Sequence, residues 1–186
     1  MNLIKLSSDL IRFKSVTPNS AGSLEFIEKI LKKNKFNCHL LEFGNKKIKN
    51  LYAEIRGGEG PNLCFAGHTD VVPAGNLKDW TTNPFKPTIK NGFLYGRGAS
   101  DMKTAIAAFM HASLEFLSSC KNKFNGSLSF LLTADEEGEA DFGTKSMVNW
   151  LKKKNHKIDL CLVGEPTNPN YLGEMIKVGR RGSLNG

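Results

Sequence analysis

The spacing of apolar residues at the start of the chain predicts two helices followed by three strands. Residues 2–14 carry large apolar side chains three and four positions apart, as on one helical face, and this pattern ends near Thr17-Pro18. The same spacing recurs from about Ser23 to Lys33. Short apolar runs then predict strands at 37–43, 50–56 and 62–67. Glycines and a proline within 56–61 indicate a hairpin turn between the last two strands.

The second half of the chain alternates between helical and strand-like patterns. A proline- and glycine-rich stretch from Thr69 to Asn91 predicts a long loop, and such loops in compact domains are usually functional. A helix is predicted from near Asp101 to about Ser119, with this apolar side: Ile106, Phe109, Met110, Ala112, Ser113 and Phe116. A strand at 127–133, a helix at 143–154 and strands at 158–163 and 174–183 are predicted next. The alternation predicts an α/β fold.

Composition and charge narrow the class of protein. The net charge of +8 comes from scattered lysines with no nucleic-acid-binding motif beside them, so solvated helix faces are favoured over a nucleic-acid surface. No run approaches the ~18 apolar residues of a membrane span, and no leader pattern is present at the start. The cysteines are scattered, which favours buried thiols in a reducing compartment: Cys38, Cys64, Cys120 and Cys161. We therefore expect a cytoplasmic protein.

Four short segments combine acids with one histidine, and three of them directly follow an apolar strand-like run. The segments are 67–70 (Gly-His-Thr-Asp), 100–103 (Ser-Asp-Met-Lys), 135–138 (Asp-Glu-Glu-Gly) and 164–167 (Gly-Glu-Pro-Thr). Open α/β sheets place ligands beyond the carboxyl ends of their strands. Carboxylates gathered at one edge would repel one another unless a cation lay between them. The pattern therefore predicts a metal-dependent hydrolase.

Each segment by itself also fits a purely structural role. His68 and Asp70 leave a strand on the same face, as a metal-bound imidazole and its orienting carboxylate do, or as any histidine satisfied by a nearby acid. Asp101 after a glycine-rich turn is equally typical of a helix cap. Glu136 and Glu137 diverge, so one could bind a metal while the other faces a water molecule, yet solvated turn acids fit as well. Only the set of four segments, in this order, is specific.

Together the segments resemble the two-zinc aminoacylase and carboxypeptidase family. The matching stretches include 67–75 (Gly-His-Thr-Asp-Val-Val-Pro-Ala-Gly), 94–103 (Leu-Tyr-Gly-Arg-Gly-Ala-Ser-Asp-Met-Lys) and 163–167 (Val-Gly-Glu-Pro-Thr). Residues 48–53 and 176–186 narrow the resemblance to a branch that hydrolyses N-succinyl-diaminopimelate, a small molecule of lysine and cell-wall precursor synthesis. The resemblance covers essentially the whole chain.

The resemblance implies a fold and a division of the chain. Residues 1–175 would form part of a zinc-peptidase-like catalytic domain, with a mixed central sheet flanked by helices. Residues 176–186 would begin a lid and dimerisation domain. Two divalent metal ions are implied, with zinc expected and cobalt or manganese also accepted by such carboxylate-rich sites. The implied metal ligands are His68, Asp101, Glu137 and Glu165.

The resemblance also implies roles in the reaction. Asp70 would orient His68, and Asp101 would bridge both ions through a cis peptide to Met102. Glu136 would take the proton of the attacking water and pass it to the leaving amine, so that succinate and diaminopimelate are the products. The implied contacts to a substrate carboxylate are Arg180 and Ser183.

Family members are longer than this chain and form homodimers through the lid. They supply a last metal-binding histidine and an oxyanion-stabilising histidine from beyond the matched region, and the remaining histidines here fit structural or exposed roles: His39, His111 and His156. We therefore expect this chain to be the N-terminal half of such an enzyme and to be inactive or nearly so by itself. It would come either from a split gene, with a separate polypeptide as the C-terminal half, or from a decayed gene. A sibling deacylase or dipeptidase, such as an acetylornithine deacetylase, and a non-catalytic fragment that binds a partner stay open.

Overall fold

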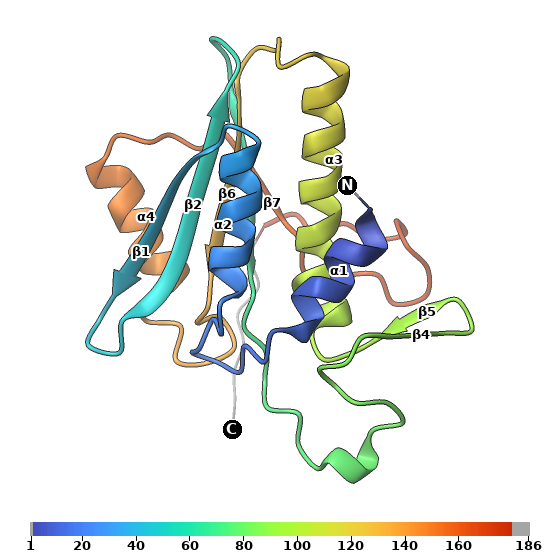
Figure 1. The fold of residues 1–186 in the computed structure, drawn as a ribbon. Helices are drawn as coiled ribbons and strands as arrows, with labels where there is room; N and C mark the ends of the chain where they lie inside the picture. The colour runs from blue at the N-terminus through green and yellow to red at the C-terminus, as the bar shows by residue number, and fades with distance from the viewer. Residues whose placement is uncertain (1, 180–186) are drawn as a thin grey trace.

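The computed structural model describes residues 2–179 (Figure 1). The elements in chain order are α1 (Leu3–Arg12), α2 (Ser23–Lys33), β1 (Asn37–Phe43), β2 (Ile48–Arg56), β3 (Asn62–His68), the 3-10 turn η1 (Leu77–Asp79), β4 (Thr88–Lys90), β5 (Phe93–Tyr95), the π-type turn η2 (Ala99–Lys103), α3 (Thr104–Ser119), β6 (Ser127–Thr133), α4 (Thr144–Lys153) and β7 (Leu160–Val163). Arg180 and Ser183 lie outside the described residues.

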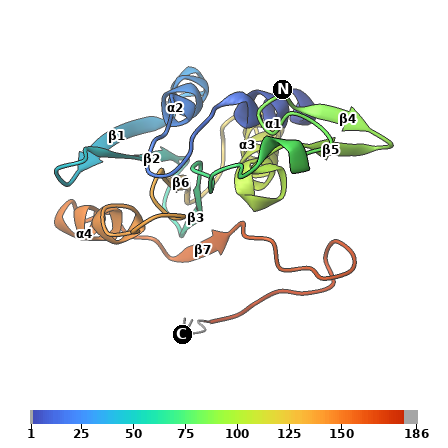
Figure 2. The same cartoon turned by 90° about the horizontal axis from the view of Figure 1, so that it is seen from below.

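A mixed sheet of five strands, in the order β1-β2-β6-β3-β7, divides the molecule into two layers of helices. Figure 2 shows α1, α2 and α3 on one side of this sheet and α4 on the other. The fold class expected from the sequence, a mixed central sheet flanked by helices, is confirmed. The helices and strands predicted within residues 2–163 also lie within a few residues of observed ones, because the helices have a clear apolar periodicity and the strands are short apolar runs.

The predicted hairpin between β2 and β3 is wrong, because β6 lies between these two strands. β6 pairs antiparallel with β2 and parallel with β3. The turn after β2 bonds to the chain leading into β6: Gly57 N–H donates to Gly126 O at 3.0 Å, and Ser127 N–H donates to Pro61 O at 3.0 Å. A turn pattern predicts where the chain reverses, but it does not show which strands become neighbours.

Four local expectations also need correction. Part of the expected long loop forms the small β4-β5 hairpin. Regular helix begins at Thr104 rather than near Asp101, whose backbone is not helical. Phe116 is 44% exposed, because it pairs with Phe124 at the surface rather than in the core. No strand is assigned to 174–179, the described part of the last predicted strand.

The cysteines are free, as expected, but they are not uniformly buried. Cys64 on β3 is buried, whereas Cys161 on the edge strand β7 is exposed. β7 has only β3 as a neighbour among the described residues, so its apolar side chains are exposed as well. Within residues 2–179 no helix combines the length and the apolar character needed to cross a membrane.

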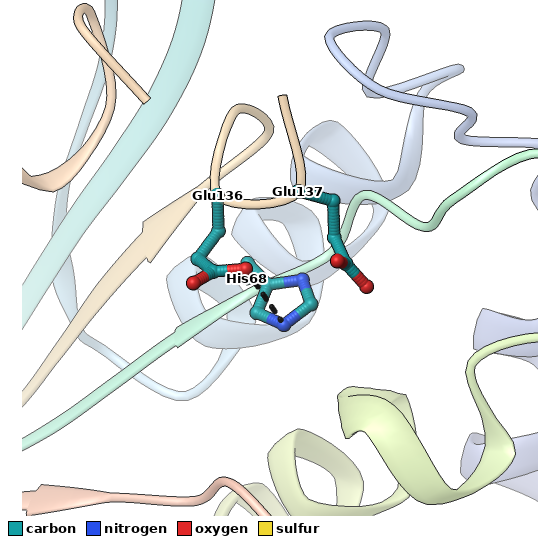
Figure 3. Close-up of side chains that lie close together, drawn as sticks. All are labelled: His68, Glu136 and Glu137. Carbon is teal, nitrogen blue, oxygen red and sulfur yellow. Dashed lines mark ion pairs between the residues drawn. The ribbon is translucent and has the colours of Figure 1, made fainter. Parts of the chain in front are cut away.

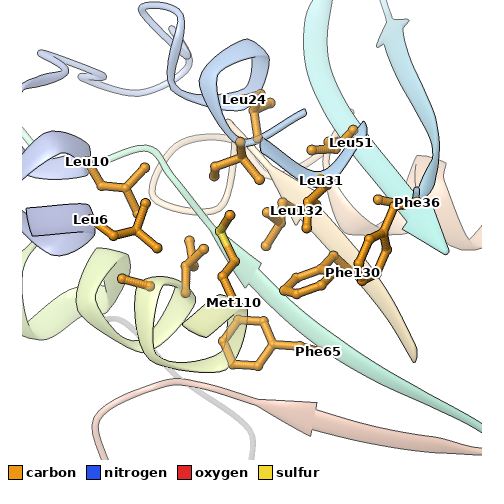
Figure 4. Packing of buried hydrophobic residues seen from close by; sticks show 14 of the residues in the cluster. Leu6, Leu10, Leu24, Leu31, Phe36, Leu51, Phe65, Met110, Phe130 and Leu132 are labelled. Carbon is orange, nitrogen blue, oxygen red and sulfur yellow. The ribbon is translucent and has the colours of Figure 1, made fainter. Parts of the chain in front are cut away.

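The main core lies between the sheet and helices α1, α2 and α3 (Figure 4). Phe130, at the centre of β6, is fully buried and packs edge-on against Phe36 and Phe109, with ring centroids 5.7 and 5.3 Å apart. Phe65 on β3 stacks on Phe109 at 4.8 Å. This aromatic cluster joins the two parallel strands whose carboxyl ends carry the acidic segments.

We expect Phe130→Ala to lower the free energy of unfolding by about 3–5 kcal/mol, since it leaves a cavity in the middle of the core. Urea denaturation followed by circular dichroism measures the change. Phe116→Ala is the matched control, because it removes an equal side chain from a half-exposed position and should cost about 1 kcal/mol or less. Equal losses from the two variants would contradict the packing described here.

Candidate metal centre

Parallel pairing brings three of the acidic segments to one edge of the sheet. His68, the last residue of β3, is in register with Thr133, the last of β6, and Thr69 N–H donates to Thr133 O at 2.9 Å. On the other side of β3, Ala66 is in register with Val163 of β7, and Gly164 follows it. The chain therefore emerges from three neighbouring strands directly before Asp70, Glu136 and Glu165.

Asp101 reaches the same edge from the turn that precedes α3. Its peptide bond to Met102 is cis, and the Met102 side chain is fully buried. The backbone N–H of His68 lies 3.4 Å from Met102 Sδ. A Cβ atom on Gly67 would lie 2.4 Å from Met102 Cε, and one on Gly164 would lie 2.9 Å from it. Gly67 at the end of β3 and Gly164 just after β7 therefore leave room for the Met102 side chain in its observed position.

The imidazole of His68 is the centre of the resulting cluster. The ring is 1% exposed, and Nε2 lies 3.1 Å from Asp101 Oδ1, 3.3 Å from Glu165 Oε1 and 3.8 Å from Glu136 Oε2. Figure 3 shows Glu136 and Glu137 extending from one loop toward this ring. Two sets of three side chains each have donor atoms within 4.8 Å of one another: His68 with Glu136 and Glu137, and His68 with Asp101 and Glu165.

This donor set fits a divalent transition metal. Imidazole nitrogen and carboxylate oxygen are the ligands that zinc, cobalt and manganese share. The carboxyl groups of Asp101, Glu136 and Glu165 retain solvent-exposed surface, so an ion and a substrate can reach them. Four carboxylates around one imidazole also leave an excess of negative charge that a cation would offset.

Asp70 lies behind the imidazole, fully buried, and holds two segments together. His68 Nδ1 is 2.9 Å from the backbone oxygen of Asp70 and 3.5 Å from its carboxylate. The same carboxylate accepts backbone N–H bonds from Glu136 at 3.1 Å and from Glu137 at 3.0 Å. Asp70 therefore sets the ring orientation of His68 and the position of both glutamates at once.

The crowded charges shift several pKa values. Burial acts to lower the pKa of His68, but hydrogen bonds and charges from Asp70 and Glu165 outweigh it and raise that pKa to about 11. Burial, together with the charge of neighbouring acids, raises the pKa of Glu136 and of Glu137. Burial and then Glu165 raise the pKa of Asp101. Protons and a cation thus compete for the same atoms, so metal binding here should release protons.

All six described residues selected from the sequence lie in this cluster. They are His68, Asp70, Asp101, Glu136, Glu137 and Glu165. The other histidines lie elsewhere, since His156 stacks on Trp150 at 5.6 Å and pairs with Glu54 at 3.2 Å, and His111 pairs with Glu115 at 3.3 Å. Sequence reasoning missed Lys103, which is buried beside the cluster. No local signal distinguishes it from a solvated lysine at a helix start.

Peptidase family M20/M25/M40 matches residues 64–179, which is more than half of the chain, and the chain belongs to this family. Among curated relatives, the succinyl-diaminopimelate desuccinylase of Pelagibacter ubique is 57% identical over 99% of this chain and 48% of its own length. The protein of the same name from Wolbachia pipientis is 52% identical over 97% of this chain and 45% of its own. The chain thus spans about half the length of these relatives.

Solved structures show the same fold. A metallo-carboxypeptidase of this family from Sulfolobus solfataricus superposes with a TM-score of 0.76 at 23% identity, over 88% of this chain and 37% of that one. Human carnosine dipeptidase 1 superposes with a TM-score of 0.75 at 20% identity, over 88% of this chain and 38% of that one. At this level of identity the likeness concerns the fold only.

We expect Asp70→Asn to weaken divalent metal binding by about 10–100-fold, because an amide cannot accept all the hydrogen bonds that orient His68 and the glutamate loop. Titration of the chain with Co²⁺, followed by visible absorption, measures the change. Asp9→Asn is the control, since Asp9 pairs only with Lys5 and Arg12 on the surface of α1. Unchanged Co²⁺ affinity in folded Asp70→Asn would show that the buried carboxylate does not organise the site.

Proposed function

We propose that this chain is an incomplete form, the N-terminal part of the catalytic domain, of a metal-dependent amide hydrolase that removes succinate from N-succinyl-LL-2,6-diaminopimelate in lysine and diaminopimelate biosynthesis. The observation that supports this most is the cluster of carboxylates around His68 at the edge of the sheet. The substrate is proposed from the names of relatives that are 57% and 52% identical to this chain. Because the chain covers about half of each relative, the activity is proposed for the whole protein.

The proposed ligands of two divalent ions are His68, Asp101, Glu137 and Glu165, with Asp101 shared between the ions. Zinc is the expected metal, and cobalt or manganese would suit the same oxygen and nitrogen donors. Bound ions of this kind polarise an amide carbonyl and make water more acidic. His68 Nδ1–H donates to the Asp70 backbone oxygen at 2.9 Å, so the neutral ring carries its hydrogen on Nδ1 and leaves Nε2 free to bind an ion.

Glu136 is the proposed general base and acid. Its side chain is 51% exposed, so a substrate and a water molecule can approach it, and Oε2 lies 3.8 Å from His68 Nε2. Burial, together with the charges of neighbouring acids, raises its pKa, which makes the carboxylate a better proton acceptor. Glu136 accepts a proton from the attacking water and delivers it to the amine nitrogen as the amide C–N bond breaks. Succinate and free diaminopimelate leave.

The remaining assignments follow the same proposal. Residues 1–175 form part of the catalytic domain, and 176–186 begin a lid and dimerisation domain through which the whole protein forms a homodimer. Arg180 and Ser183, beyond the described residues, hold a substrate carboxylate, for which a guanidinium is well shaped. The protein acts in the cytoplasm on a small molecule. A separate polypeptide that completes the catalytic domain is a further proposed partner.

In the test, this chain is mixed with zinc and a second polypeptide. The second polypeptide is the part of the Pelagibacter relative that has no counterpart in this chain. We expect the pair to release succinate from N-succinyl-LL-2,6-diaminopimelate in preference to acetate from N-acetylornithine, and this chain alone to be at least about tenfold slower than the pair. Glu136→Gln should lower the rate by about 10²–10⁴-fold, because the proton relay is lost while the proposed metal ligands stay in place.

Three outcomes would contradict the proposal. Preference for N-acetylornithine would indicate a sibling deacylase. Bound metal without hydrolysis in the pair would indicate a non-catalytic fragment. An unchanged rate in Glu136→Gln would remove the proton-transfer role, with Glu139→Gln as the matched control because Glu139 lies in the same loop and pairs with Lys46 at 3.0 Å.

A further inference from the structure

Lys103 is fully buried, although lysine is seldom buried without a partner. It is the one lysine or arginine side chain buried within residues 2–179. Its Nζ donates a hydrogen bond to the backbone oxygen of Phe13 at 2.9 Å, across ninety positions of the sequence. Burying a long, flexible, charged side chain costs free energy, so other contacts must offset that cost.

The hydrogen bond to Phe13 connects two parts of the proposed metal centre. The segment after Phe13 pairs with the chain that leaves β3: Val71 N–H donates to Ser15 O at 2.9 Å, and Ser15 Oγ donates to Thr69 O at 2.6 Å. This segment therefore supports the backbone on both sides of Asp70. Lys103 itself follows Asp101 and Met102 directly, so its side chain joins the turn that carries Asp101 to the support of Asp70.

Gly98 and Val71 lie beside the aliphatic part of the Lys103 side chain. Gly98 has a φ of +78°, and a Cβ there would lie 3.0 Å from Lys103 Cδ and 2.8 Å from Val71 Cγ1. Lys103 N–H donates to Gly98 O at 2.9 Å. The stem thus runs between Val71 and the glycine turn, and a side chain at Gly98 would displace it.

The charge of Lys103 complements that of the centre. Asp70 is itself fully buried, and a buried carboxylate is tolerated only where positive charge and hydrogen-bond donors surround it. Lys103 brings one positive charge into this buried region, where its Nζ donates to the Phe13 backbone oxygen.

We propose that Lys103 is a positioning residue for the metal centre. Its buried ammonium bonds to Phe13 and so joins the Asp101 turn to the segment that supports the backbone on both sides of Asp70. Asp101 and His68 then present their donor atoms to the same ion. The inference rests on the proposed function only in requiring a metal at this centre. It does not depend on which amide is hydrolysed.

The test compares Lys103→Met, which removes the charge and the donor but keeps an unbranched stem, with Leu31→Ala. Leu31 is fully buried in α2 and belongs to the main core, so Leu31→Ala is a destabilising control outside the metal centre. The readouts are the thermal midpoint without metal, the Kd for Co²⁺ and the visible spectrum of bound Co²⁺. Both variants should lower the midpoint. Only Lys103→Met should raise the Kd, by about tenfold or more, and alter the spectrum.

Unchanged Co²⁺ affinity and spectrum in Lys103→Met would overturn the inference, since a lysine that only fills space alters stability alone. If the unsubstituted chain binds no Co²⁺, the proposed metal centre and this inference both fail. That result differs from the one above, in which the unsubstituted chain binds Co²⁺ and only the role of Lys103 is wrong. Should Lys103→Met not fold, Lys103→Gln replaces it with the same expectations, because glutamine has no charge and its side chain ends one bond short of the Nζ that reaches Phe13.

Discussion

The buried carboxylate of Asp70 is the constraint on which the arrangement of this site depends. A negative charge without solvent must be surrounded by donors or cations. Here His68 approaches it from the end of β3, and the backbone N–H groups of Glu136 and Glu137 approach it from the loop after β6. One oxygen pair therefore determines where an imidazole and two glutamates lie. Without it, the loop after β6 would have no specific attachment to the end of β3.

The contacts of Asp70 with His68 and with the loop after β6 are possible because of how the strands pair. β6 lies between β2 and β3, so β3 and β6 are parallel neighbours whose carboxyl ends emerge together. Aromatic packing of Phe65 and Phe130 through Phe109 holds this parallel pair from the helical side. Gly67 and Gly164 then leave room for Met102, which brings Asp101 against the same edge. Core packing and site geometry are thus produced by the same two strands.

Much of the site could be recognised from local sequence. Each of the acidic segments after β3, β6 and β7 follows a short apolar run that is typical of a buried strand. The residues behind them could not be recognised in this way. Met102 and Lys103 look like the first turn of an exposed helix, and Phe116 looks like a core residue, because burial depends on neighbours that are distant in sequence.

The order of residues along the chain was therefore enough to predict most helices and strands and the α/β class, because apolar patterns are properties of short segments. It was also enough to select the residues proposed to bind metal, because the type of donor atom is a property of each residue. Strand order, the burial of Lys103 and the convergence of Asp101 on His68 were decided only in three dimensions. They depend on long-range pairing and packing, such as the bonds that place β6 beside the turn at Gly57, and no short segment contains both partners of such a contact.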